Sequence, residues 1–382
     1  MKKLLIVLNE DISVYQKKGE IIDRYYNPNN FFDEVIFLMV GFSNEYDNKI
    51  LQRLVGKAQF KVYFLEVNIK KSLILFPFGL DNIYLNNKLN KINLENIDLI
   101  RAYGMGLNFY FAHKIAKKLN KSYILSLHNQ FDELKKIEKI SLKKTILNYY
   151  LEKKSIKSLK EADLVIGVYS PIEKYTKKIE VKNYQTIYNV INPENITKKT
   201  DYKIKDKFRI INVGRQIIGR DISKIIQAIA EIENIEFLVI GDGEYHNKLV
   251  NLAKELNILN KKVFFKKAIP NDEICEILPT FDCYIGHSEY AEIAKSTMEA
   301  MLTGLPIVFN KREDYQVKEM EESGVILVDN KMDNYKSILL KLKNDVSFRI
   351  KKASEVYKYA MNNFDPQKIE NKIVEVYKEF IQ

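Results

Sequence analysis

The chain contains few residues of the kinds that cross-link a fold or bind metals. Its 382 residues include two cysteines, Cys275 and Cys283, four histidines and no tryptophan. Two cysteines cannot form the disulfide framework of a small secreted domain, and they fit a reducing compartment. The histidines are scattered, and no Cys or His cluster has the spacing of a metal site. We therefore expect no bound metal and no organic cofactor.

Long hydrophobic runs are also missing. The apolar residues 4–8 near the N-terminus are followed at once by Asn9, Glu10 and Asp11, too early for a signal peptide or a membrane span. Elsewhere no run approaches the roughly 18 residues that a span requires. These features predict a cytoplasmic protein, with peripheral contact at the inner membrane face left open.

Positive charge is in excess and is concentrated in one segment. The formal net charge is +11, and residues 134–160 hold nine lysines against two glutamates, interleaved with Ile, Leu and Tyr. Such a basic amphipathic stretch is either a solvated helix or a surface, Lys135–Lys160, that docks on an anionic membrane or an acidic acceptor. A nucleic-acid-binding protein would instead combine clustered basic residues with exposed aromatics. We expect no nucleic-acid partner.

Short apolar runs alternate with helical patterns along the chain, as buried parallel strands and their connecting helices do. Predicted strands cover residues 4–8, 34–40, 61–65, 98–102, 123–127, 163–168, 186–189, 208–213, 235–240, 263–265, 283–286, 306–309 and 324–328. Predicted helices cover residues 106–119, 132–160, 222–232, 245–256, 272–278, 296–302, 333–343, 348–364 and 366–380.

A charged segment without apolar periodicity, residues 192–207, interrupts this alternation and is typical of a linker. The chain is long enough for two domains of about 150–200 residues each. The sequence therefore predicts an α/β fold of two doubly wound, Rossmann-like domains facing a cleft, residues 1–195 and 196–382.

Two strand ends in the second half carry groups suited to a diphosphate. The first strand is followed by Gly214 and Arg215, with Arg220 five residues later, so that two guanidiniums flank one loop. Charged hydrogen bonds of this kind contribute about 1.5–3 kcal/mol each. The next strand ends at Gly241 and Gly243, which either let a ligand approach the backbone or form a plain turn.

A third motif lies within residues 288–308. A helix is expected to begin near Ser296 and Thr297 and to end at Gly304, so its free N–H groups and partial positive charge suit a phosphate. Glu299 lies about one turn inside this helix, where a carboxylate can accept hydrogen bonds from sugar hydroxyls.

The order and spacing of these three motifs resemble the family 4, or group 1, glycosyltransferases of GT-B architecture. Their second domain carries a Gly-Arg pair, a Lys five or six residues later, a Gly-Asp-Gly turn and a Glu-x7-Glu motif that ends in Glu-Ala-Met…Gly-x-Pro. In this chain the corresponding residues are Gly214-Arg215, Arg220 in place of the lysine, Gly241-Asp242-Gly243, Glu299-Ala300-Met301, Gly304 and Pro306. The resemblance covers most of residues 208–309.

The resemblance implies roles for individual residues. Arg215 and Arg220 bind the donor diphosphate, and Glu299 accepts hydrogen bonds from the nucleotide ribose. The remaining implied contacts are backbone N–H groups of Lys295, Ser296 and Thr297 with phosphate, Ile269 beside the base, and Glu292 and His128 with the donor sugar.

One departure from the family pattern concerns the first acid of Glu-x7-Glu. Counting back eight residues from Glu299 reaches Ala291, whereas Glu292 is one position late. Either the loop is one residue shorter and Glu292 takes the role, or Ala291 marks the loss of that acid and Lys295 adds charge near the phosphates. We favour the shorter loop.

The resemblance implies a retaining, metal-independent hexosyltransferase that moves a sugar from a nucleotide diphosphate sugar to a hydroxyl of a glycan or lipid-linked acceptor, in surface polysaccharide synthesis. The nucleotide sugar is then a co-substrate, and the last helix, residues 366–380, crosses back to the first domain. A GT-B nucleotide-sugar epimerase, or a sugar-nucleotide-binding protein without catalysis, remains as an alternative.

Overall fold

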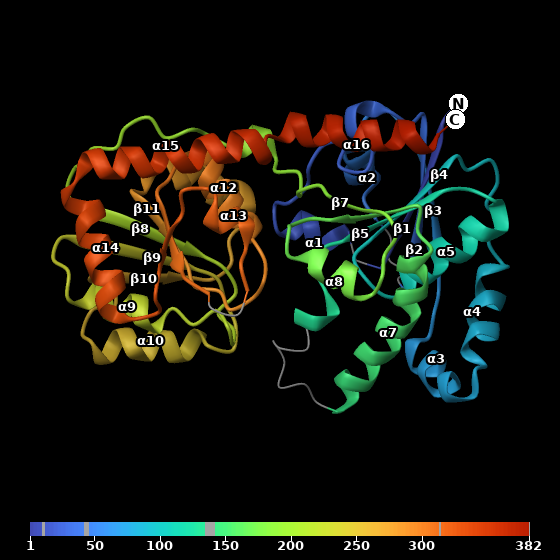
Figure 1. Cartoon of the computed structure of the whole chain (residues 1–382), viewed down its shortest axis with the longest axis horizontal. Coiled ribbons are helices and arrows are strands. Elements are labelled where there is room, and N and C mark those ends of the chain that lie inside the picture. Colours follow the sequence, from blue (N-terminus) through green and yellow to red (C-terminus); the bar gives the residue numbers. More distant parts are fainter. Residues whose placement is uncertain (10–11, 42–45, 134–141, 313–314, 382) are drawn as a thin grey trace. The chain divides into compact units, whose positions relative to one another are not determined.

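The computed structural model describes residues 1–9, 12–41, 46–133, 142–312 and 315–381. Over these residues the chain forms two sheets with helices between successive strands (Figure 1), and the paired strands run parallel. This confirms the predicted α/β class. The chain divides into two compact units: unit 1 comprises residues 1–17, 21–190 and 367–382, and unit 2 comprises residues 18–20 and 191–366.

Unit 1 contains a seven-stranded sheet with the strand order β3-β2-β1-β4-β5-β6-β7. Its strands are β1 Lys3–Leu8, β2 Glu34–Val40, β3 Gln59–Leu65, β4 Leu99–Tyr103, β5 Tyr123–Leu127, β6 Leu164–Gly167 and β7 Tyr184–Thr186. Its helices are α1 Ile12–Lys17, α2 Asn48–Val55, α3 Ile69–Leu75, α4 Asp81–Leu89, α5 Leu107–Leu119, α7 Leu142–Lys160, α8 Ile172–Lys178 and α16 Pro366–Phe380.

The central strands of unit 1 are buried along their whole length. Each residue of β2, β4 and β5 is buried, as continuous apolar runs predict for strands covered on both faces. The strand order reverses between β1 and β4, which pair from Leu4 with Leu99 onward. Ligands of open parallel sheets bind outside the carboxyl ends of the strands at such a reversal.

Unit 2 contains a six-stranded sheet with the order β10-β9-β8-β11-β12-β13, which reverses between β8 and β11. Its strands are β8 Phe208–Val213, β9 Ile235–Ile240, β10 Val263–Lys266, β11 Cys283–Ile285, β12 Ile307–Asn310 and β13 Ile326–Val328. Its helices are α9 Ser223–Ala230, α10 His246–Glu255, α11 Asn271–Ile277, α12 Lys295–Thr303, α13 Lys318–Glu321, α14 Met332–Asn344 and α15 Val346–Asn363.

Several short helices of unit 1 were not predicted. In α2, the Asp47 side chain accepts a hydrogen bond from the backbone N–H of Lys49 and caps the helix, while Leu51, Leu54 and Val55 are buried. Helices α3 and α4 likewise have fewer than ten residues, so their apolar periodicity is brief. For the predicted helix 132–160, residues 134–141 lie outside the described residues.

The segment predicted as a linker is held against unit 2 over part of its length. Lys199 is buried, its backbone N–H donates to the carbonyl of Thr303, and its ammonium lies 3.7 Å from Asp282. The hydroxyl of Tyr202 donates to the carbonyl of Gly304 at 2.8 Å. The polar composition of residues 192–207 concealed these anchors because each partner is distant in sequence.

Helix α16 belongs to unit 1, although it follows α15 of unit 2 in the chain. Ile369, Ile373, Val376 and Tyr377 are members of the core of unit 1, together with residues of β1 and β2. In the part of the chain that the structure describes, no helix is both long and apolar enough to cross a membrane.

A buried ion pair joins α4 to α7. The carboxylate of Asp81, 1% exposed, pairs with the ammonium of Lys154, 9% exposed, which also donates to the Asn82 side chain at 2.8 Å. A buried pair that loses one partner leaves an uncompensated charge.

We predict that Asp81→Asn lowers the free energy of unfolding of unit 1 by about 3 kcal/mol, since Lys154 then stays buried without an anion. Denaturant titration measures the change. The double variant Asp81→Asn/Lys154→Met should recover most of the loss, and Glu180→Gln, which removes an exposed partner of Lys160, should have no measurable effect. Equal stability of the single and double variants would contradict this account.

Candidate functional site

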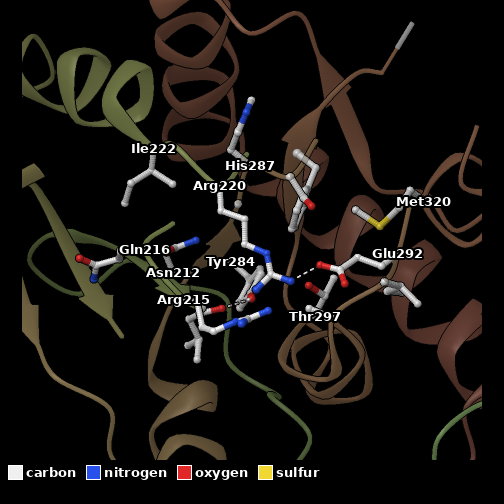
Figure 2. A pocket seen from close by; sticks show the side chains of 17 residues that line it. Asn212, Arg215, Gln216, Arg220, Ile222, Tyr284, His287, Glu292, Thr297 and Met320 are labelled. Carbon is white, nitrogen blue, oxygen red and sulfur yellow. Dashed lines mark hydrogen bonds and ion pairs between the residues drawn. The ribbon is translucent and has the colours of Figure 1, made fainter. Parts of the chain in front are cut away.

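A pocket of about 520 Å³, open to solvent, lies in unit 2 (Figure 2). The loops that follow β8 and β11 line it together with the start of α12, so it lies at the carboxyl ends of strands on both sides of the reversal in strand order. The predicted residues that line it are Gly214, Arg215, Arg220, Glu292 and Thr297.

The two arginines after β8 differ in their exposure and in whether they form an ion pair. Arg215 is exposed and lines the pocket. Arg220 is largely buried and forms an ion pair with Glu292, and Figure 2 shows the two side chains pointing toward one another. The guanidinium of Arg220 also lies 5.5 Å from the centre of the Tyr290 ring. An anion in this pocket would therefore share Arg220 with Glu292.

Glu292 and Ala291 were the two candidates for the position of the first acid of the Glu-x7-Glu motif. Glu292 lines the pocket, and Ala291 is fully buried. The position of Glu292 is set by the loop between β11 and α12, in which the backbone N–H of Glu292 donates to the carbonyl of Tyr290 at 2.9 Å. Its carboxylate therefore faces the same space as Arg215 and Arg220.

Helix α12 begins beside the pocket without a capping side chain. Its N-cap residue is Ala294, and Lys295, Ser296 and Thr297 form the first turn. The hydroxyl of Ser296 is directed to the carbonyl of Val213 at 3.1 Å, which holds the helix start against the end of β8. The first N–H groups of an uncapped helix attract an anion, and the helix dipole adds a partial positive charge.

Glu299 is a buried carboxylate one turn inside α12. It is 1% exposed, and its Oε1 accepts a hydrogen bond from the Asn271 side chain at 2.9 Å. Its Oε2 is buried without a hydrogen-bond partner among the described residues. Burial raises the pKa of Glu299, while Lys295 and Asn271 favour the ionised form. The free oxygen can accept a hydrogen bond from a ligand hydroxyl.

Gly241 and Gly243 allow two loops to pack closely. Their φ angles are +139° and +152°, and a Cβ at Gly241 would lie 2.0 Å from the carbonyl oxygen of Gly214. A Cβ at Gly243 would lie 2.3 Å from the carbonyl oxygen of Gln216. These glycines therefore bring the loop after β9 against the loop that carries Arg215. Neither they nor Ile269, which precedes α11, are among the residues that line the pocket.

Sequence motifs did not select His287, which also lines the pocket. The side chain is 5% exposed, neither ring nitrogen has a hydrogen-bond partner among the described residues, and Nε2 lies 3.6 Å from the Glu289 carboxylate. Burial lowers its pKa, so the imidazole is neutral near pH 7. Its position just after β11 could have indicated it, because Gly214 and Arg215 were selected as residues that directly follow a strand.

His128 belongs to unit 1, where it follows β5 and lines a separate cavity with Arg101 and Tyr103. Burial, and secondarily the charge of Arg101, lower the pKa of His128 to about 4. The side chain is therefore a neutral donor and acceptor near pH 7.

Residues 194–362 match the sequence model of the family described as glycosyl transferases group 1. The 2-deoxystreptamine glucosyltransferase of Streptomyces kanamyceticus is 28% identical over 28% of this chain and 30% of that protein. The lipopolysaccharide core biosynthesis glycosyltransferase LpsE of Rhizobium meliloti is 22% identical over 31% of this chain and 34% of that protein. The matches thus span about a third of each relative.

The whole chain resembles a solved structure. HepE of Anabaena, in complex with UDP, superposes with a TM-score of 0.70 at 14% identity, over 99% of this chain and 100% of that one. At this identity the likeness shows the fold, which is the GT-B fold expected from the motifs. The match to the group 1 glycosyl transferases covers residues 194–362, which belong to unit 2.

Proposed function

We propose that the chain transfers a sugar from a nucleotide diphosphate sugar to a hydroxyl group of an acceptor. The observation that carries the proposal is the buried, unpartnered Oε2 of Glu299, one turn inside a helix whose start is uncapped beside two arginines. Hydroxyl donors and a diphosphate are the two groups that this arrangement would satisfy together. UDP, which the solved structure of HepE contains, is a suitable first probe.

In the proposed reaction the bond between the donor sugar and the diphosphate breaks, and negative charge develops on the leaving diphosphate. That charge is stabilised by Arg215, Arg220 and the start of α12, which take the place of a metal ion. The family resemblance adds retention of configuration, with the leaving phosphate accepting the acceptor's proton. Glu292 lies near the donor sugar, and His287 offers the pocket a neutral imidazole.

In this proposal unit 2 binds the donor and unit 1 binds the acceptor, and the family resemblance assigns His128 to the donor sugar. A glycan or lipid-linked acceptor of surface polysaccharide synthesis agrees with the name of the relative LpsE. The two free, buried cysteines fit a cytoplasmic site of action.

We also propose that unit 1 docks on an anionic membrane. The α3–α4 surface exposes Ile74, Phe78, Leu80 and Ile83, of which Phe78 is 74% exposed. Helix α7, the described part of the basic segment, is joined to α3 by a Ser72–Tyr150 hydrogen bond and exposes Lys143, Lys153 and Lys157. Exposed apolar side chains flanked by lysines match a lipid surface with anionic headgroups.

We predict that Glu299→Gln weakens UDP binding roughly 10- to 100-fold, because a hydrogen bond to a charged group contributes about 1.5–3 kcal/mol. Isothermal calorimetry measures the affinity. The loss should shrink to about twofold for 2′,3′-dideoxyuridine diphosphate, which lacks the ribose hydroxyls that Glu299 would contact.

The proposed donor site is refuted if no nucleoside diphosphate or nucleotide sugar stabilises the protein against heat and if Arg215→Ala leaves every affinity unchanged. Binding of a nucleotide sugar without either transfer or hydrolysis would instead identify a non-catalytic binding protein.

We predict that Glu292→Gln lowers kcat for transfer at least about tenfold, while UDP binds as tightly as before or more tightly, because Arg220 is released from its ion pair. His128→Ala should likewise lower kcat without weakening UDP. Steady-state kinetics and calorimetry separate the two effects, and Glu289→Gln on the exposed side of the same loop is the control. Full activity of Glu292→Ala would refute the assignment of the first acid to Glu292.

We predict that Ile74→Glu/Phe78→Glu abolishes sedimentation of the protein with vesicles that contain phosphatidylglycerol. Vesicles of phosphatidylcholine alone should bind the unaltered protein weakly, since the lysines then lack anionic headgroups. Ile350→Glu removes an exposed apolar side chain from unit 2, 45% exposed, and should sediment like the unaltered protein. If Ile74→Glu/Phe78→Glu sediments normally, α3–α4 is not the docking surface.

A further inference from the structure

Arg101 is a cation in the interior of unit 1. It occupies the middle of β4, the strand next to the reversal in strand order, and its side chain is 4% exposed. A buried charge is costly unless a counter-charge or strong hydrogen bonds compensate it. The partners of this guanidinium are therefore informative.

The contacts of Arg101 are all neutral. Its Nε and Nη2 donate to the hydroxyl oxygen of Ser126 at 3.3 and 3.2 Å, and Nη1 donates to the hydroxyl oxygen of Tyr377. The rings of Tyr103 and Tyr377 lie 4.6 and 5.4 Å from the guanidinium carbon. No carboxylate of the described residues forms an ion pair with it.

Other buried cations of this chain are compensated. Lys154 pairs with Asp81, and Lys199 lies 3.7 Å from Asp282. Arg349 has no ion pair but donates to the backbone carbonyls of Tyr202, Leu342 and Lys343, the last two of which end a helix and carry partial negative charge. Arg101 has neither a carboxylate nor carbonyl acceptors of this kind.

Arg101 lines a cavity that is open to solvent. The walls come from the ends of β4 to β7 and from α16, all within unit 1, and include Tyr103, Ser126, His128 and Tyr188. The hydroxyl of Tyr103, a residue 6% exposed, has no hydrogen-bond partner among the described residues. The cavity thus combines a cation that lacks an anionic partner among the described residues with the hydroxyl of Tyr103.

We propose that this cavity binds an oxyanion, phosphate or carboxylate, through Arg101 and the hydroxyl of Tyr103. The planar guanidinium suits the two oxygens of either anion, and the aromatic walls exclude water and strengthen the attraction. His128 is neutral near pH 7 and can donate a further N–H. No acidic side chain is among the residues that line the cavity.

The position of the cavity identifies the molecule that carries the oxyanion. It lies at the carboxyl ends of the strands in unit 1, where doubly wound domains bind ligands, whereas the proposed donor pocket is in unit 2. If the proposed transfer is correct, the acceptor is a phosphorylated or carboxylate-bearing saccharide. This assignment rests on the proposed function, but the oxyanion site does not.

Calorimetry on the full chain, with the donor site saturated by UDP, tests the proposal with inorganic phosphate and acetate as probes. At least one anion should bind, and Arg101→Met should weaken it at least about tenfold. Tyr103→Phe, which keeps the ring and removes only the hydroxyl, should weaken it about threefold or more. Arg53→Met, which removes an exposed guanidinium of unit 1 that pairs with Asp23, should bind the anion as the unaltered protein does. The stronger of the two probes identifies the acceptor's anionic group.

UDP affinity and circular dichroism of each variant report whether it remains folded, and Tyr103→Phe keeps the test decisive if Arg101→Met unfolds. The proposal is overturned if neither anion binds, or if Tyr103→Phe and every folded Arg101 variant bind the anion as tightly as the unaltered protein. Failure of UDP to bind would count against the donor site in unit 2. Failure of both anions to bind while UDP still binds would count against the oxyanion site and not against the donor site. The two failures are therefore distinguishable.

Discussion

Burial of the parallel strands on both faces is the constraint that determines where this chain can carry polar chemistry. Every residue of β2, β4 and β5 is buried, so a polar side chain within these strands needs a partner from another element. Polar groups that contact solvent are left to the ends of the strands. The pocket of unit 2 and the cavity of unit 1 both lie there, next to the reversal in strand order.

Two buried ionisable groups stand out against this background. Glu299 has one carboxylate oxygen without a partner among the described residues, and Arg101 has only neutral partners there. Lys154 and Lys199, by contrast, lie beside Asp81 and Asp282. Because a buried polar group without a full set of partners destabilises a fold, a ligand that completes these groups would explain their retention. The acid would receive hydroxyl groups, and the arginine would receive an anion.

The pocket of unit 2 also depends on close backbone packing. Gly241 and Gly243 bring their loop to the carbonyl oxygens of Gly214 and Gln216, and this contact supports the loop that carries Arg215. The Arg220–Glu292 ion pair lies within the same pocket. Arg220 and Glu292 lie side by side in this pair, so a bound diphosphate would compete with the Glu292 carboxylate for the Arg220 guanidinium.

Local pattern was enough to predict much of the fold and part of the site. Continuous apolar runs predicted the buried strands, because alternation of strand and helix is encoded within a few residues. Helices α2 to α4 escaped prediction, although α11 and α12 are similarly short and were predicted. The loop after β8 and the start of α12 could be recognised because their motifs are contiguous in sequence.

The sequence by itself determined that this is an α/β chain, because that property follows from neighbouring residues, and it predicted a helix start suited to a phosphate. Only the tertiary structure decided which charges are compensated. Arg101 stood within a predicted strand, and its hydroxyl partner on Tyr377 is 276 positions away. Arg220 and Glu292 are 72 positions apart. Oε2 of Glu299 lacks a partner because no hydrogen-bond donor of the described residues lies close enough to it. Compensation of a buried charge is set by distances of a few ångströms between remote segments, which no local pattern encodes.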